Sequence, residues 1–230
     1  MGSSSSACDG RPVMRLALLA SGRGSNVAAI LEAIRAGRLE AEAVILVCDR
    51  PGAPVSGLAE DVGVTVRLLP RSGFADRAAW DAAVRAVLLE ARADLVALAG
   101  FAAILGPAVL AAFPGRILNI HPSLLPAFGG GMAPAPQEAA LRAGVTTTGC
   151  TVHVVTADVD GGPIMAQARV PVLPGDSVAS LSDRILAAEH RLYPDVLGWF
   201  ASGWVRVEEG RVYRHRPREA AGHGPLSGAL

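Results

Sequence analysis

The sequence contains no lysine: all 21 of its basic residues are arginine, and 21 acidic residues balance them. A formal net charge of zero gives the molecule no bulk field that would attract nucleic acid or an anionic membrane. We therefore expect no nucleic acid and no membrane among its partners. A small or internally charged ligand fits this composition better.

Cysteine is scarce. Cys8, Cys48 and Cys150 are odd in number, far apart in the chain and without the paired spacing of a metal site. This pattern argues against a disulfide framework and against a zinc site, and it favours reduced thiols in a cytoplasm. The simplest interpretation makes Cys48 and Cys150 core residues.

Long apolar runs and a secretory leader are missing as well. No apolar stretch reaches the length of a membrane span, and the first residues lack the basic start and apolar segment of a signal peptide. These absences, with the thiols, predict a cytoplasmic location.

Apolar residues, in contrast, make up 51% of the 230 residues, and the mean hydropathy is positive, which predicts a well-buried core. We find no internal repeat and no strong linker. The expected division is a disordered leader over 1–13, one main domain over 14–206, and the end of a C-terminal hairpin with a loose tail over 207–230.

Short apolar segments alternate with helical periodicity from Arg15 onward. Expected strands cover 16–20, 43–47, 64–69, 95–99 and 116–120. Expected helices cover 27–34, 58–62, 80–91 and 109–113. This alternation predicts an α/β fold, a doubly wound and mostly parallel sheet flanked by helices.

The pattern changes after the Gly/Pro-rich stretch 128–136. Expected there are a short helix near 138–142, strands over 148–156 and 164–170, a long helix capped by Ser177, and a hairpin around Glu209-Gly210. We interpret this part as a mixed-direction C-terminal elaboration of the sheet.

The strand that ends in Asn119-Ile120-His121-Pro122 carries the main chemical signal. Side chains alternate along a strand, so Asn119 and His121 project to the same face, and Pro122 restrains His121 to an extended conformation. With Asp160 in a later Asp-Gly-Gly-Pro turn, an amide, an imidazole and a carboxylate suit an acyl-transfer site. Singly, a strand histidine and such a turn are more often structural.

A second signal is the loop Ser21-Gly22-Arg23-Gly24-Ser25-Asn26 between the first strand and its helix. Glycines permit close backbone approach, and free N–H groups at a helix start attract phosphate. The loop is neither a dinucleotide fingerprint nor a Walker loop, because the later glycine and the lysine are missing. A tight turn with Ser25 or Asn26 as N-cap explains it equally well.

The chain closely resembles the glycinamide ribonucleotide formyltransferase family from about Arg15 to Arg206. Four segments match in order and spacing: the loop 21–26, Ala99-Gly100-Phe101, the run 118–126 and the turn that begins at Asp160. The resemblance implies an enzyme of purine biosynthesis. It would transfer the formyl group of 10-formyltetrahydrofolate, its cosubstrate, to the amine of glycinamide ribonucleotide. It would need no metal and would work as a monomer or homodimer.

The resemblance also implies roles for individual residues. Asn119 would donate a hydrogen bond to the tetrahedral oxyanion and a protonated His121 would stabilise it, while Asp160 would hold His121 and help a water shuttle the proton. The implied ribonucleotide site comprises Gly24, Ser25, Asn26, Arg77 and Glu189. The implied folate site comprises Ala102, Ala103, Ile104, Leu105, Leu110, Ala157, Asp158 and Val159.

The chain departs from the family pattern in places. Ala102-Ala103 stands where the family commonly has a larger residue and then a basic one, and Leu186 stands where a polar substrate contact is often found, so we expect weaker contacts at the folate mouth. The loop 129–137 contains three consecutive glycines and is expected to be mobile. By resemblance, the Leu125-Pro126 peptide is expected to be cis.

Three alternatives stay open at this level. A formyltetrahydrofolate hydrolase usually has a regulatory domain in front, for which this sequence has almost no room. A methionyl-tRNA formyltransferase would add a basic RNA-binding domain after about residue 206. A non-catalytic nucleotide-binding module would not require Asn119, His121 and Asp160 to converge, so their mutual distances discriminate.

Overall fold

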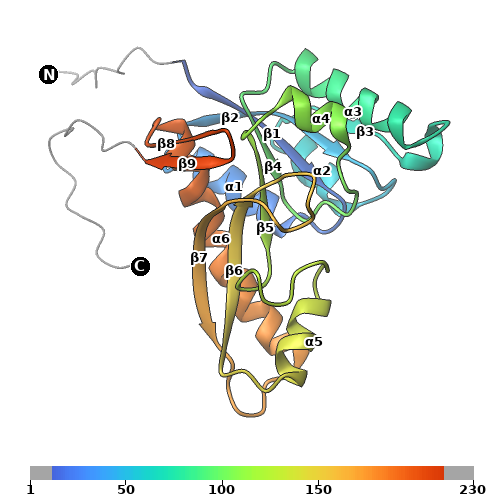
Figure 1. Ribbon diagram of the computed structural model, residues 1–230. Coiled ribbons are helices and arrows are strands. Elements are labelled where there is room, and N and C mark those ends of the chain that lie inside the picture. The colour runs from blue at the N-terminus through green and yellow to red at the C-terminus, as the bar shows by residue number, and fades with distance from the viewer. Residues whose placement is uncertain (1–11, 215–230) are drawn as a thin grey trace, which may run out of the picture.

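The computed structural model describes residues 12–214 (Figure 1). Its elements are, in chain order, β1 (Met14–Ala20), α1 (Ser25–Arg35), β2 (Ala41–Cys48), α2 (Pro54–Glu60), β3 (Val66–Leu68), the 3-10 turn η1 (Arg71–Gly73), α3 (Arg77–Glu90), β4 (Leu95–Leu98), α4 (Pro107–Ala112), β5 (Ile117–His121), α5 (Ala135–Arg142), β6 (Thr147–Val154), β7 (Ile164–Pro171), α6 (Val178–Ala201), β8 (Val205–Glu208) and β9 (Arg211–Arg214).

Seven strands form one sheet in the order β3-β2-β1-β4-β5-β6-β7. The first five run parallel, whereas β6 and β7 are antiparallel to their neighbours. The predicted α/β class is confirmed, with its parallel sheet and mixed-direction C-terminal part. The strand order reverses between β1 and β4, and in open α/β sheets such a reversal creates a crevice for ligands at the carboxyl ends of the strands.

Helices cover both faces of the sheet, which is why the parallel strands are almost wholly apolar. Along β1, Leu16, Leu18 and Ala20 pack in the core beneath α1, α2 and α6. The intervening Ala17 and Leu19 pack in the core beneath α3 and α4. Alternation along one strand thus supplies two separate cores.

The long helix α6 packs against α1 from the start of the fold and against β6 and β7. It begins at the predicted cap Ser177, which forms a capping box with Ser180. In Figure 1, β6 and β7 reach beyond the other strands, with α5 and α6 beside them. The predicted hairpin around Glu209-Gly210 is present as the separate pair β8–β9.

Some element boundaries were wrong. The second helix begins at Pro54 rather than Leu58, because proline suits the first helical turn, where its missing N–H costs no bond. For the same reason α5 begins at Ala135, so residues 135–137 of the expected mobile loop form a helical turn in which Gln137 is buried. The Leu125-Pro126 peptide is cis as expected, and Ala133-Pro134 is cis as well.

Cys48 and Cys150 are buried and free, as expected for core residues. Cys8, nearly all of the expected leader and the tail after Arg214 lie outside the described residues. Between residues 12 and 214, no helix combines the length and apolar character needed to cross a membrane.

Candidate active site

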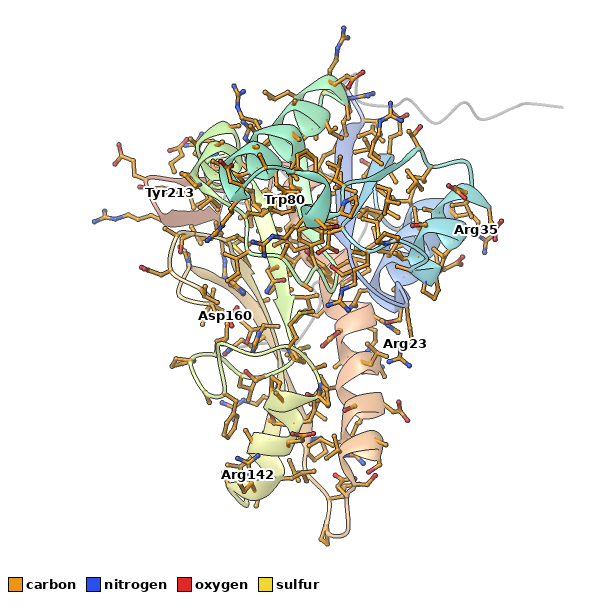
Figure 2. The ribbon with its side chains drawn as sticks, turned by 90° about the vertical axis from the view of Figure 1, so that its right-hand side faces the viewer. Arg23, Arg35, Trp80, Arg142, Asp160 and Tyr213 are labelled. Atoms are coloured by element: carbon orange, nitrogen blue, oxygen red, sulfur yellow. The ribbon has the colours of Figure 1, made fainter. Side chains whose placement is uncertain are left out.

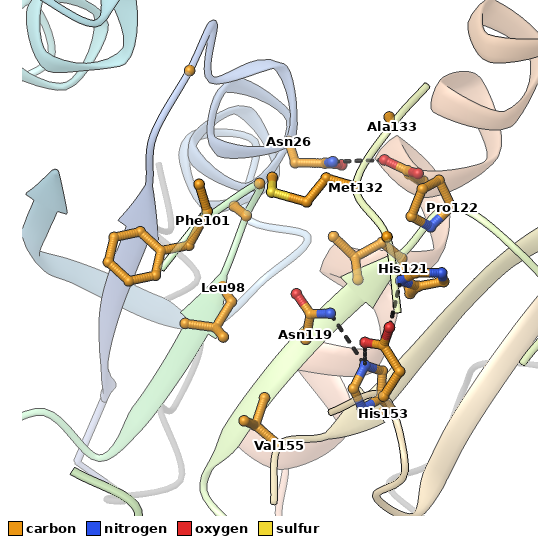
Figure 3. A pocket seen from close by; sticks show the side chains of 18 of the residues that line it. Asn26, Leu98, Phe101, Asn119, His121, Pro122, Met132, Ala133, His153 and Val155 are labelled. Carbon is orange, nitrogen blue, oxygen red and sulfur yellow. Dashed lines mark hydrogen bonds and ion pairs between the residues drawn. The ribbon is translucent and has the colours of Figure 1, made fainter. Parts of the chain in front are cut away.

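A cavity of about 460 Å³ opens at the carboxyl ends of β1, β4 and β5 (Figure 3). Figure 2 places Asp160 midway along the molecule, between Trp80 in the α3 layer and Arg142 at the end of α5. The predicted residues that line this cavity are Gly24, Ser25, Asn26, Ala102, Ala103, Ile104, Leu105, Asn119, His121, Asp158, Val159, Asp160 and Glu189. Residues as far apart in the sequence as Gly24 and Glu189 therefore meet at one crevice.

The loop after β1 presents the start of α1 to the cavity. Gly24 is the N-cap, rather than the suggested Ser25 or Asn26, and it contributes no capping side chain. Its φ of 81° is left-handed, and an added Cβ would lie 2.5 Å from Val55 Cγ2, so only glycine fits. Uncapped N–H groups at a helix start favour an anion such as phosphate.

Asn26 and Glu189 form one polar pair on the same wall. The Asn26 amide donates to Glu189 Oε2 at 2.7 Å, and both residues are buried. Burial raises the pKa of Glu189 to about 7, and the bond from Asn26 opposes that rise. Asn26 Oδ1 is buried and has no partner among the described residues, so this acceptor is left for a ligand.

Asn119 is oriented by a histidine on the neighbouring strand. Asn119 Nδ2 lies 3.1 Å from His153 Nε2, and the two residues pair across β5 and β6. His153 Nδ1 lies 3.0 Å from the Val154 carbonyl oxygen, which can only accept. Because burial lowers the pKa of His153, the ring is neutral, with Nδ1 donating and Nε2 accepting from Asn119. One amide N–H of Asn119 then stays available for a ligand.

His121 lies between two acceptors. Its Nδ1 is 3.3 Å from Asp160 Oδ2, and its Nε2 is 3.1 Å from the Phe128 carbonyl oxygen. A neutral imidazole has one N–H and can donate to only one of them, whereas the cationic ring donates to both. Both ring nitrogens of His121 therefore face hydrogen-bond acceptors, one of them a carboxylate.

Asp160 is held at the centre of this group. Its Oδ1 lies 3.5 Å from His153 Nε2, and its Oδ2 accepts from the Gly130 N–H at 2.7 Å. The residue has a positive φ of 54°, a conformation that aspartate adopts more readily than most non-glycine residues. The turn also packs tightly on β6, since a Cβ at Gly162 would lie 1.9 Å from the Val154 carbonyl oxygen.

The predicted trio is thus brought together: His121 touches Asp160 directly, and Asn119 bonds to His153, whose ring lies beside Asp160. Such an arrangement places an oriented amide donor and an imidazole paired with a carboxylate beside one cavity. It suits a reaction in which negative charge develops on an oxygen. A non-catalytic nucleotide module gives no reason for this convergence.

Three predicted residues lie elsewhere. Arg77, Leu110 and Ala157 line a second cavity of about 410 Å³, which shares Ile104 and Leu105 with the first. Arg77 donates to the carbonyl oxygens of Ile104 and Leu105, each at 3.4 Å. The structure therefore does not bring Arg77 together with Gly24, Ser25 and Asn26.

Sequence reasoning missed His153 and the cavity residue Met132. For His153, the signal was its place on a strand seven residues before Asp160. Its partner, however, depends on the register of β5 against β6. Within residues 12–214, no group of three or more His, Cys, Asp or Glu side chains could hold a metal ion.

A family model described as formyl transferase matches residues 14–197. The chain belongs to the formyl transferase family. The resemblance drawn from the motifs is confirmed, because the match covers nearly all of the described residues.

Curated relatives of this formyl transferase include phosphoribosylglycinamide formyltransferase of Escherichia coli (strain K12), 36% identical over 200 residues, or 87% of this chain and 93% of that protein. The trifunctional purine biosynthetic protein adenosine-3 of Bos taurus is 45% identical over 201 residues, or 86% of this chain and 19% of that protein. The chain thus spans about a fifth of the length of this trifunctional relative.

Solved structures agree with the fold. Glycinamide ribonucleotide transformylase 1 from Symbiobacterium toebii matches with a TM-score of 0.85 and 44% identity, covering 92% of this formyl transferase and 99% of that chain. Phosphoribosylglycinamide formyltransferase from Coxiella burnetii matches with a TM-score of 0.83 and 35% identity, covering 88% of this formyl transferase and 94% of that chain.

Proposed function

We propose that this formyl transferase moves the formyl group of 10-formyltetrahydrofolate to the amine of glycinamide ribonucleotide in purine biosynthesis. The observation that supports this most is the convergence of Asn119, His121 and Asp160 on a cavity that also contains an uncapped helix start. The names of the relatives at 36% and 44% identity agree with it.

In the proposed reaction the substrate amine attacks the formyl carbon and a tetrahedral oxyanion forms. The free N–H of Asn119 donates to that oxygen, and the cationic His121 stabilises it by its charge. Asp160 holds His121 at 3.3 Å and, through a water, passes the proton from the attacking amine to the departing folate nitrogen. The bond from the formyl carbon to that nitrogen then breaks, so neither a metal nor a covalent enzyme intermediate takes part.

We assign the polar part of the cavity lining to the ribonucleotide and the apolar part to the folate. Gly24, Ser25 and Asn26 offer backbone N–H groups to the phosphate of the ribonucleotide. Glu189 and the unpartnered oxygen of Asn26 are acceptors, which suits hydroxyl or amine donors of the same substrate. Residues 102–105 and Val159 supply apolar lining to the same cavity, and we assign them, with Asp158, to the folate.

Arg77 is better placed for the donor than for the ribonucleotide phosphate. It lies against Ile104 and Leu105, on the folate side of the site. Its guanidinium is the only one on the second cavity among the described residues, so we propose that it contacts an anionic part of the folate.

Location and assembly are proposed from the sequence. A cytoplasm fits the two free, buried thiols, and the proposed partners are the two small substrates, with the chain working as a monomer or homodimer.

The deciding experiment is incubation of the purified chain with 10-formyltetrahydrofolate, with and without glycinamide ribonucleotide, following folate absorbance and the formylated product. We expect turnover only when the amine is present. His121→Ala and Asp160→Ala should each abolish transfer while the far-UV spectrum of the folded chain stays unchanged.

Equal folate turnover without the amine would identify a hydrolase instead. Wild-type activity in either variant would remove the proposed catalytic pair. If the chain bound the ribonucleotide but turned over no folate in either incubation, it would be a non-catalytic nucleotide-binding module.

A further inference from the structure

We propose that Met132 covers the reacting centre and makes the formyl group go to the substrate amine rather than to water. The inference rests on the proposed function, because it concerns the choice between two nucleophiles at the same site. Met132 lies in the loop 129–137, to which the motifs assign no chemical role, in the stretch Gly129-Gly130-Gly131-Met132-Ala133.

The loop that carries Met132 is fastened to the catalytic pair. The Gly130 N–H donates to Asp160 Oδ2 at 2.7 Å, and the Phe128 carbonyl accepts from His121 Nε2 at 3.1 Å. A Cβ added to Gly129 would lie 3.7 Å from Asp160 Cβ, so the backbone passes directly over this carboxylate. The position of the loop is therefore coupled to the two groups that do the chemistry.

From this anchor Met132 reaches into the cavity. It lines the same cavity as Asn26, Phe101 and His121, and in Figure 3 its side chain extends from the loop toward Asn26 and Phe101. On the other side of the residue, the Ala135 N–H donates to the Met132 carbonyl at 3.0 Å in the turn that leads into α5. Both sides of the segment are thus held, and the side chain points inward.

Met132 is 48% exposed although it lines the cavity, and two other large apolar residues share this property. Ile104 is 54% exposed and Val159 is 56% exposed, and they come from two other segments. An exposed apolar side chain gains free energy when a ligand covers it. Three such side chains around a polar centre form a rim that closes onto bound substrates and displaces water.

Water is the competing nucleophile in this reaction. If water adds its oxygen to the formyl carbon, the bond from that carbon to the folate nitrogen breaks, the nitrogen takes a proton, and formate leaves. The oxyanion donors serve that reaction as well as they serve the amine. Exclusion of every water except the one that carries the proton at Asp160, rather than the choice of catalytic groups, must therefore separate transfer from hydrolysis.

The test compares Met132→Ser with wild type, measuring formate, tetrahydrofolate and formylated ribonucleotide in the same mixture. We expect the ratio of formate to formylated product to rise roughly tenfold, which corresponds to about 1.4 kcal/mol between the two barriers. Met132→Leu keeps an apolar side chain of similar volume and should restore the wild-type ratio.

Leu173→Ser is the matched control, since Leu173 is also 48% exposed but lines neither cavity. It should leave the ratio unchanged. An unchanged ratio in Met132→Ser, or an equal rise in the Leu173 control, would overturn the inference. Failure of the wild-type chain to formylate the ribonucleotide at all would instead overturn the proposed function.

Discussion

At the scale of single residues, the orientation of one amide decides whether Asn119 can act as an oxyanion donor. His153 fixes that orientation, because its Nε2 accepts and so must face the amide nitrogen of Asn119. Without this acceptor the amide can turn over and present its oxygen to a developing negative charge. His153 therefore acts through Asn119 as a positioning residue.

We predict that His153→Phe lowers kcat about tenfold, while Asn119→Ala, which removes the donor itself, lowers kcat by about a hundredfold. Both KM values should change little, because neither side chain is assigned to ground-state binding. His153→Gln retains an oxygen that can accept from Asn119 and should recover much of the loss. Equal kcat values for the Phe and Gln variants would contradict the positioning role, since only the acceptor separates them.

The sequence located Asn119 and His121 in the site but not His153. Asn119 and His121 were found because strand alternation puts both on one face, and that geometry is local. His153 was missed because its partner is set by the pairing of β5 with β6, which neither strand specifies by itself. The phosphate role of Arg77 rested on the resemblance alone, and in the folded chain Arg77 lines the second cavity.

At the scale of elements, the start of α1 is shaped by Gly24 in two ways. The left-handed φ of 81° disfavours any side chain, and Val55 from α2 fills the space that a Cβ would need. The same close approach fixes the N–H groups that we assign to phosphate. Helix geometry and substrate binding therefore depend on the same residue.

Gly24→Ala should destabilise the chain by about 1–3 kcal/mol more than a purely conformational penalty, because the new methyl overlaps Val55. It should also raise the KM for the ribonucleotide. Gly37→Ala is the matched control: its φ of 68° is also left-handed, but nothing lies within 4 Å of the added Cβ. Thermal unfolding and steady-state kinetics of the two variants check this, and equal Tm losses would argue against the overlap.

Element types followed from periodicity almost throughout, because apolar spacing is a local property. Boundaries failed at α2 and α5, where prolines begin helices that the apolar pattern alone starts later. The first turn of α5 contains no large apolar residue, and that of α2 contains only Val55, so the apolar stripe does not mark the start of either helix.

At the scale of the whole molecule, Glu189 couples folding to pH. Its pKa rises from 4.5 to about 7 on burial, so between these values the folded chain binds a proton that the unfolded chain has lost. The unfolding free energy must therefore fall as pH rises through this window. The shift corresponds to a penalty on the order of 3 kcal/mol above pH 7.

We predict that Glu189→Gln is as stable as wild type at pH 4 and more stable than wild type at pH 8. The glutamine oxygen still accepts from Asn26, so the comparison isolates the charge. Urea unfolding of both proteins from pH 4 to pH 8 measures the difference. A constant difference across this range would show that Glu189 titrates normally in the folded chain.

The bond between Asn26 and Glu189 joins residues 163 positions apart. It forms only when α6 has docked beside α1, after every strand of the main sheet has been made by the ribosome. Contacts of such long sequence separation require the largest loop closure during folding. Recovery of enzyme activity after dilution from denaturant should therefore lag behind recovery of helical signal, and no N-terminal fragment that ends before α6 can assemble the ribonucleotide wall.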